Sequence, residues 1–177
     1  ENQGRDTDAL KKWSAENGGV NSDVIVPEND NRGSPLLIAC ELDLPYACRT
    51  LISLGSDVNY RHPRAHGNSP LLRCAEMGYD ECLKELMAAR EIDVVGCLTR
   101  EYKLVLGQNI PQYEAGGRSA LLLAVESVRV GTVEILLQHE QGQKLLELKD
   151  SFGRTLLEAA FEKLALREGQ ESEGQNK

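Results

Sequence analysis

The sequence predicts an all-α repeat protein in which helix-turn-helix units stack side by side. Four segments begin with Ser or Thr and continue with apolar residues, and their starts are separated by 35, 50 and 36 residues. A second apolar helical segment follows each of the first three starts. Self-similarity at this period is typical of repeat architectures, in which each unit buries its apolar face against its neighbours. The four starts are Ser34, Ser69, Ser119 and Thr155.

Each start carries the signals of a helix N-terminus. A Ser or Thr hydroxyl can accept a hydrogen bond from a free backbone N–H of the first turn. Pro35 and Pro70 then occupy the first helical position, where the missing N–H of Pro costs nothing. The residues two positions after each start are expected to face the core, and the small residues five positions after it to let neighbouring helices approach closely. These are Leu36, Leu71, Leu121 and Leu157, and Ala39, Cys74, Ala124 and Ala160.

Second helices are expected over residues 46–54, 80–89 and 130–139. Gly55 ends the first of them, because Gly readily adopts the left-handed conformation that closes a helix. No clear second helix follows Thr155, so residues 155–166 are expected to form a C-terminal cap. At the other end, residues 8–16 have the pattern of the second helix of a degenerate first repeat, with Trp13 packing this cap. The polar residues 167–177 are expected to be disordered.

Over residues 29–166 the chain resembles the ankyrin-repeat family. Residues 34–59 keep the spacing of the family motif, which begins Thr-Pro-Leu-His-x-Ala and ends Gly-Ala-Asp-Val-Asn, and residues 66–71 and 152–155 match the turn into the family's first helix. The resemblance implies a solenoid of about three full repeats, with degenerate caps at residues 1–28 and at the C-terminus. An insertion at residues 96–117 departs from the pattern. So does the motif His, which is replaced by Leu37, Leu72, Leu122 and Glu158.

Composition narrows the classes of function. The chain has 28 acidic and 20 basic residues, a net charge of -8, which argues against a nucleic-acid partner and permits a basic one. Five Cys without a CxxC pair favour a reducing, intracellular compartment, in the cytoplasm or nucleus. The lack of an apolar run of 18 residues argues against membrane insertion. We expect a monomeric domain cut from a longer protein, because the chain begins without Met or a signal pattern.

One column of acidic residues is the first candidate for partner binding. The family resemblance implies that partners bind the concave surface, which is formed by the first helices and the hairpin tips. A carboxylate late in a short helix faces the negative end of its dipole, at a cost of ~0.3–1 kcal/mol. Two interpretations stay open: a site for a basic peptide, or a solvated face inherited by duplication. The column, seven residues after each start, is Glu41, Glu76, Glu126 and Glu162, with Met77 and Arg118 as further candidates.

Two loop segments are further candidates. In the insertion, residues 103–106 favour a β-strand, and a finger there would offer Tyr102 and Tyr113 to a partner; alternatively the insertion folds back over its own repeat. Residues 60–66 form a local basic cluster at an expected hairpin tip. There Arg64 and His66 could bind a phosphate or carboxylate, or belong to a solvated loop.

Catalytic and metal-binding patterns are missing from the sequence. Cys40, Cys48, Cys74 and Cys82 fall in columns where the family has small apolar residues, so we expect them in the core and Cys97 alone to be exposed. No His is positioned to activate a thiol or to bind a metal with Cys or acidic neighbours, so neither a metal nor a cofactor is expected. The sequence therefore predicts a non-enzymatic module that binds a partner protein or a basic peptide. The alternative is a structural spacer, or an intramolecular docking domain of a multidomain protein.

Overall fold

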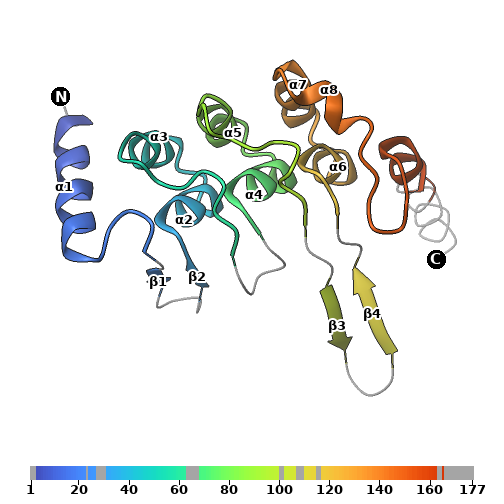
Figure 1. Cartoon of the computed structure of the whole chain (residues 1–177), viewed down its shortest axis with the longest axis horizontal. Helices are drawn as coiled ribbons and strands as arrows, with labels where there is room; N and C mark the ends of the chain where they lie inside the picture. The colour runs from blue at the N-terminus through green and yellow to red at the C-terminus, as the bar shows by residue number, and fades with distance from the viewer. Residues whose placement is uncertain are drawn as a thin grey trace, which may run out of the picture.

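In the computed structural model, the chain forms a row of antiparallel helix pairs with hairpins projecting from one side (Figure 1). The structure describes residues 3–22, 24–26, 31–62, 68–99, 102–106, 110–114, 117–162 and 165. The helices are α1 (Gln3–Glu16), α2 (Pro35–Glu41), α3 (Pro45–Ser53), α4 (Pro70–Met77), α5 (Asp80–Met87), α6 (Ala120–Glu126), α7 (Val130–Gln138) and α8 (Gly142–Leu145). The strands are β1 (Val24–Val26), β2 (Asn31–Gly33), β3 (Tyr102–Leu106) and β4 (Ile110–Glu114).

The helix pairs form two rows. The inner row, α2, α4 and α6, lies nearer the hairpins, and the outer row, α3, α5 and α7, lies behind it (Figure 1). Each inner helix packs against its own outer partner and against the inner helix of the next repeat. The outer helices contact one another in the same sequence. This arrangement confirms the predicted stack of helix-turn-helix repeats.

The N-termini of the inner helices are closed as the sequence predicts. The hydroxyls of Ser34, Ser69 and Ser119 each accept a hydrogen bond from the backbone N–H three residues later, at 3.2 Å in all three repeats. Pro35 and Pro70 are the first residues of α2 and α4. These Ser side chains are buried, so the hydrogen bonds satisfy N–H groups that water does not reach.

The core lies between the two rows and runs the length of the stack. Leu36, Leu71 and Leu121 are almost fully buried, as expected from their common position. The fourth member of that column departs from the prediction, because Leu157 is 69% exposed. The column packs each repeat against the next one. The helix formed by residues 156–162, directly after the fourth start, is the last regular helix that the structure describes, so no described helix packs against its outer face. The C-terminal segment therefore presents an apolar outer face, where the sequence predicted a cap.

Two antiparallel hairpins extend the helical stack. The first pairs β1 with β2, and the second pairs β3 with β4 from Tyr102 opposite Glu114 to Leu106 opposite Ile110. The second hairpin projects away from the helices (Figure 1), as the finger interpretation of the insertion expected. It does not lie over its own repeat, as the alternative required.

The two ends of the chain differ from the regular repeats. Helix α1 lies across the direction of the other helices in Figure 1, so it is not stacked as the second helix of a first repeat. The segment after it is tied to the first full repeat by Asn21, which accepts a hydrogen bond from the Asp57 N–H at 2.7 Å and donates one to the Gly55 carbonyl at 3.3 Å. Trp13 is half-buried. The predicted tail, residues 167–177, lies outside the described residues.

None of the described helices is long and apolar enough to cross a membrane.

Candidate functional site

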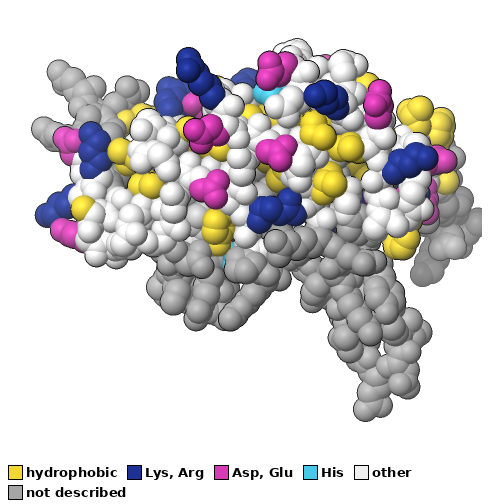
Figure 2. Space-filling view, viewed as in Figure 1, with side chains coloured by type: hydrophobic (Ala, Val, Ile, Leu, Met, Phe, Trp, Pro, Cys, Tyr) yellow, Lys and Arg dark blue, Asp and Glu magenta, His cyan; other side chains and the backbone are white. Residues whose placement is uncertain are grey.

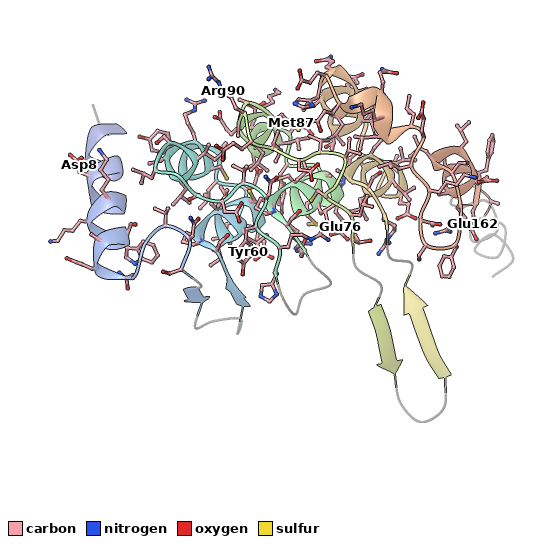
Figure 3. All side chains as sticks on the ribbon, in the orientation of Figure 1. Asp8, Tyr60, Glu76, Met87, Arg90 and Glu162 are labelled. Carbon is pink, nitrogen blue, oxygen red and sulfur yellow. The ribbon has the colours of Figure 1, made fainter. Side chains whose placement is uncertain are left out.

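The acidic column lies on the inner row, at the ends of its helices. Glu41 and Glu126 are the last residues of α2 and α6, and Glu76 is in the last turn of α4, beside the half-buried Met77. Figure 3 shows Glu76 on the hairpin side of its helix, with Glu162 farther along the stack. The structure thus places the column along the inner row, as the repeat register predicts.

Arginines from the same chain pair with three of these carboxylates. Glu76 binds Arg73, one turn earlier on α4, at 3.3 Å. Glu126 binds Arg118 at 3.3 Å. Glu162 binds the guanidinium group of Arg154. The face is therefore a ladder of alternating charges, where the sequence predicted an acidic column with Arg118 as its one basic candidate. We call this set, Arg73, Glu76, Arg118, Glu126, Arg154 and Glu162, the charge ladder.

A buried carboxylate anchors the C-terminal part of the charge ladder. Asp150 has a fully buried side chain, and its Oδ2 lies 2.7 Å from Nη2 of Arg154. Its Oδ1 accepts hydrogen bonds from the backbone N–H groups of Phe152 and Arg154, at 2.9 and 3.0 Å. Burial opposes ionisation of this group, but these hydrogen bonds and the guanidinium charge outweigh it and lower the pKa of Asp150.

Arg154 connects the third and fourth repeats. It contacts Asp150 and Glu162 of its own repeat, and Nη2 also lies 4.0 Å from the Glu126 carboxylate of α6. Glu126 is the most enclosed carboxylate of the ladder, with 18% of its side chain exposed. A guanidinium group with several donors in one plane can hold carboxylates on different sides at once, which a Lys ammonium cannot do in the same geometry.

The base of the second hairpin joins directly to the ladder. Thr99 and Arg118 pair across it: the Thr99 N–H donates to the Arg118 carbonyl at 3.0 Å, and the Arg118 N–H donates to Thr99 Oγ1 at 3.0 Å. The Gly117 N–H donates to the Thr99 carbonyl at 2.8 Å. The hairpin therefore emerges next to the Arg118–Glu126 pair, in front of the N-terminus of α6.

The two tyrosines proposed for the finger are not neighbours on one face. Tyr102 is opposite Glu114, and Tyr113 is opposite Lys103. Because opposite residues of an antiparallel pair share a face and successive residues alternate, the register assigns the two Tyr positions to different faces. That the finger offers the two Tyr side chains to a partner stays a prediction.

The basic cluster is only partly described. Arg64 and His66 lie outside the described residues. Of its other members, Arg61 donates to the backbone carbonyl of Leu98, and the backbone N–H of the buried His62 donates to the Asn68 carbonyl at 2.8 Å. The described part of this cluster therefore binds the protein's own backbone.

Four cysteine thiols gather in the core between the first two full repeats. Cys40, Cys48, Cys74 and Cys82 are all fully buried, as predicted. Sγ of Cys48 lies 3.5 Å from that of Cys40 and 3.7 Å from that of Cys82. Hydrogen bonds to Cys48 and Cys74, together with burial, raise the pKa of the Cys40 thiol, which makes the reactive thiolate less accessible.

Cys97, expected to be exposed, is buried. It is 7% exposed, and its Sγ lies 2.9 Å from the capping hydroxyl of Ser69. Burial raises the pKa of this thiol. The burial of Cys97 could not be predicted from its place in the sequence, because Cys97 does not stand at a position that repeats. The segment that carries it passes over the start of α4, beside Ser69. Among the described residues, no group of three or more His, Cys, Asp or Glu side chains could hold a metal ion.

Sequence reasoning missed two arginines of the ladder and the carboxylate that anchors it. The sequence held a signal for both arginines. Arg154 stands directly before a capping residue, as the predicted Arg118 does, so the two occupy the same position of successive repeats. Arg73 lies three residues before Glu76, a spacing at which side chains on a helix are neighbours. Asp150 could be assigned only from the turn that encloses it.

Comparison with known proteins agrees with the architecture. No family model matches the sequence, and no curated protein matches it. Among solved structures, the chain is similar to the crystal structure of EF0377, an ankyrin repeat protein, with a TM-score of 0.61 and 24% sequence identity. The match covers 86% of this chain and 65% of that one, so the chain spans less than two thirds of its length. The stacked helix pairs and projecting hairpins described above thus form an ankyrin-repeat solenoid.

Proposed function

We propose that this chain is a non-enzymatic protein-interaction module that binds a basic segment of a partner protein along the charge ladder. The observation that carries the proposal is the placement of Glu76, Glu126 and Glu162 at one position of successive repeats, along the inner row. The ankyrin-repeat fold is typical of protein-interaction modules, and its rigid stack presents side chains at a regular spacing.

The electrostatics of the ladder favour a basic partner. The chain as a whole has a net charge of -8, which attracts a basic segment toward the ladder. Partly exposed ion pairs contribute only about 0–1 kcal/mol each, so a Lys or Arg of a partner can replace an internal arginine at little cost.

The test is binding of labelled basic, acidic and neutral peptides by fluorescence anisotropy at low and physiological salt. The variant Glu76→Gln/Glu162→Gln removes two exposed charges and keeps their shape. The matched control is Glu81→Gln on α5, a carboxylate of similar exposure on the outer row. We expect salt-sensitive binding of basic peptides that weakens at least tenfold in the ladder variant and is unchanged in the control. Equal binding by the wild type and the ladder variant would reject the proposal.

The C-terminal end supports a second candidate function, docking against another domain of a longer protein. Phe152, Leu157 and Phe161 are 59%, 69% and 69% exposed. A terminal repeat ordinarily needs a polar outer face for solubility, so an apolar end favours a covered surface. If this end is normally covered, the isolated chain should associate through it in sedimentation experiments, and Leu157→Asp should restore a monomer. A wild-type chain that stays monomeric at high concentration would count against docking at this end.

A further inference from the structure

The loops that join inner to outer helices share a backbone feature. The ninth residue after each of the first three starts, Asp43, Gly78 and Val128, has a positive φ of 51°, 76° and 57°. Gly78 fits this left-handed conformation without strain. Val128 does not, because the branched Cβ of a Val approaches its own carbonyl oxygen there. A β-branched residue with positive φ is a rare exception that the surrounding structure must hold in place.

Burial does not compensate for this strain. Val128 is 53% exposed, and Val130, two residues later, is 67% exposed. Neither side chain belongs to the core cluster. Gly78 shows that the same turn closes without a side chain, so the fold does not require Val at this position. The chain therefore retains an unfavourable backbone conformation that displays an apolar side chain to solvent.

Other exposed apolar side chains lie along the same edge of the stack. Leu42 and Leu44, in the equivalent loop of the first repeat, are 60% and 46% exposed. Met77 and Tyr79 of the second repeat lie between them and the third repeat, half-buried. We call residues 42–44, 77–80 and 127–130 the loop edge. Figure 2 shows hydrophobic side chains gathered over α6 on the face turned to the viewer.

Direct contacts between loops make this edge one continuous surface. The Cys82 thiol donates to Asp43 Oδ1 at 3.4 Å, which ties the first loop to the second repeat. Arg129 donates from Nε to the Glu76 carbonyl at 3.3 Å and lies across Gly78, where an added Cβ would come within 2.7 Å of its Cδ. Thr132 donates to Asp80 at 2.6 Å. A partner would therefore meet a preformed surface.

Charge indicates the chemistry of the partner. In the loop edge, Asp43 and Asp80 are acidic, and Arg129 is the one cation among its residues. The inner helices beside it carry Glu41, Glu76 and Glu126 in their last turns. Aliphatic side chains that lie between carboxylates match a segment with apolar residues on one face and Lys or Arg beside them. Complementary charge of this kind sets orientation and encounter rate more than affinity.

We propose that the loop edge is a second interaction surface, which docks an amphipathic basic segment of a partner protein. Its aliphatic side chains cover Val128, Val130 and Leu44, and its cations face Asp43 and Asp80. The surface adjoins the charge ladder at Glu76 and Glu126, but its apolar contacts come from the loops, so substitutions at Leu44 and Val130 test it apart from the ladder. Val128 is the residue expected to contribute most specifically to binding, because its strained backbone lowers the stability of the fold while its side chain stays exposed.

The test uses a labelled helical peptide with Leu on one face and Lys on the other, and a scrambled peptide of the same composition. We expect the intact chain to bind the amphipathic peptide and Leu44→Asp/Val130→Asp to bind it at least tenfold more weakly. Glu76→Gln/Glu162→Gln, the ladder variant, should weaken binding of the amphipathic and the scrambled peptide alike, because both carry the same Lys residues, and should leave the preference for the amphipathic peptide unchanged. Equal binding of the two peptides, or of the wild type and the loop-edge variant, would overturn the proposal.

A second measurement isolates Val128. Val128→Gly and Val128→Asn, which suit a left-handed conformation, should raise the melting temperature by about 2–4 °C and weaken binding of the amphipathic peptide. Such opposite effects on stability and binding would not arise from a residue that serves folding. An unchanged or lower melting temperature in both variants would reject the strain argument. Concentration-dependent self-association that Val130→Asp abolishes would instead assign the loop edge to a second copy of this chain.

Discussion

The second and third full repeats have nearly the same interior and different edges. Ser69 and Ser119 cap their inner helices with hydrogen bonds of equal length, and Leu71 and Leu121 are both fully buried. Outside the core the two repeats diverge. A Gly closes the helix-helix loop of the second and a strained Val that of the third, which also carries the projecting hairpin before it.

The difference shows that core packing constrains the residues at buried positions of a repeat, whereas the binding of partners constrains those at exposed positions. A buried column admits only side chains that fit between neighbouring helices, since interiors are close-packed. An exposed column is free of that requirement, so an unfavourable residue there signals another constraint. Stability measurements at matched positions of the two repeats can test this division.

The largest effect is expected in the buried column. Leu71→Ala and Leu121→Ala should each lower the free energy of unfolding by about 2–5 kcal/mol, because each leaves a cavity between tightly packed helices. Urea denaturation followed by circular dichroism would measure both. The two losses should be similar, which would confirm that the repeats have equivalent interiors.

Leu157→Ala is the matched control. It occupies the same column in the fourth repeat but is 69% exposed, so its loss should be well under that of either buried Leu. A loss at Leu157 as large as that at Leu121 would show that another segment covers this face in solution.

This column also shows how far sequence reasoning reaches. The caps, the inner Leu residues and the second helices follow from local signals and repetition, and the structure confirms them. The exposure of Leu157 cannot be predicted from these local signals, because it depends on what packs against the outer face of the fourth repeat. The orientation of α1 is equally hidden, since its apolar pattern shows that a helix forms but not what it packs against.

The candidate site was predicted only in part, because only some of its residues stand at positions that repeat. The Glu column was visible because it repeats, but its pairing with Arg154 depends on a turn around the buried Asp150 that has no equivalent in the other repeats. Cys97 was misplaced because it belongs to no column. The strain at Val128 could not be anticipated, since nothing in its local sequence requires a positive φ.

The loops provide the next prediction. Gly78→Val should destabilise the chain by roughly 1–2 kcal/mol from the left-handed backbone alone, with a further loss from the displacement of Arg129. Val128→Gly should act in the opposite direction and stabilise it by less, because Gly also gains entropy in the unfolded state. Thermal unfolding of the two variants would show this. Changes of the same sign would mean that the two loops are not equivalent.

A smaller effect is expected at the caps. Ser69→Ala and Ser119→Ala should each cost about 1 kcal/mol, the usual loss when a helix N-terminus forfeits its side-chain acceptor. The loss at Ser69 should be the larger one, because its hydroxyl also contacts the buried Cys97 thiol. Cys97→Ala should remove that difference in chemical denaturation. If the difference persists in the Cys97→Ala background, the thiol contact contributes nothing to it.

The last effect is seen in the pH dependence of stability, because the contribution of the Asp150 charge is fully present at neutral pH and is lost in acid. Because the pKa of Asp150 is lowered by folding, the unfolded chain binds its proton first as the pH falls through the ordinary value of 3.8. The free energy of unfolding should therefore decline below about pH 5 and level off once the folded state is also protonated. Asp150→Asn should have a shallower decline over this range. Some decline should remain, because hydrogen bonds from Thr155 also lower the pKa of Glu158. Identical pH profiles for wild type and variant would mean that Asp150 does not stabilise the fourth repeat through its charge, and that Arg154 is held by the ladder carboxylates alone.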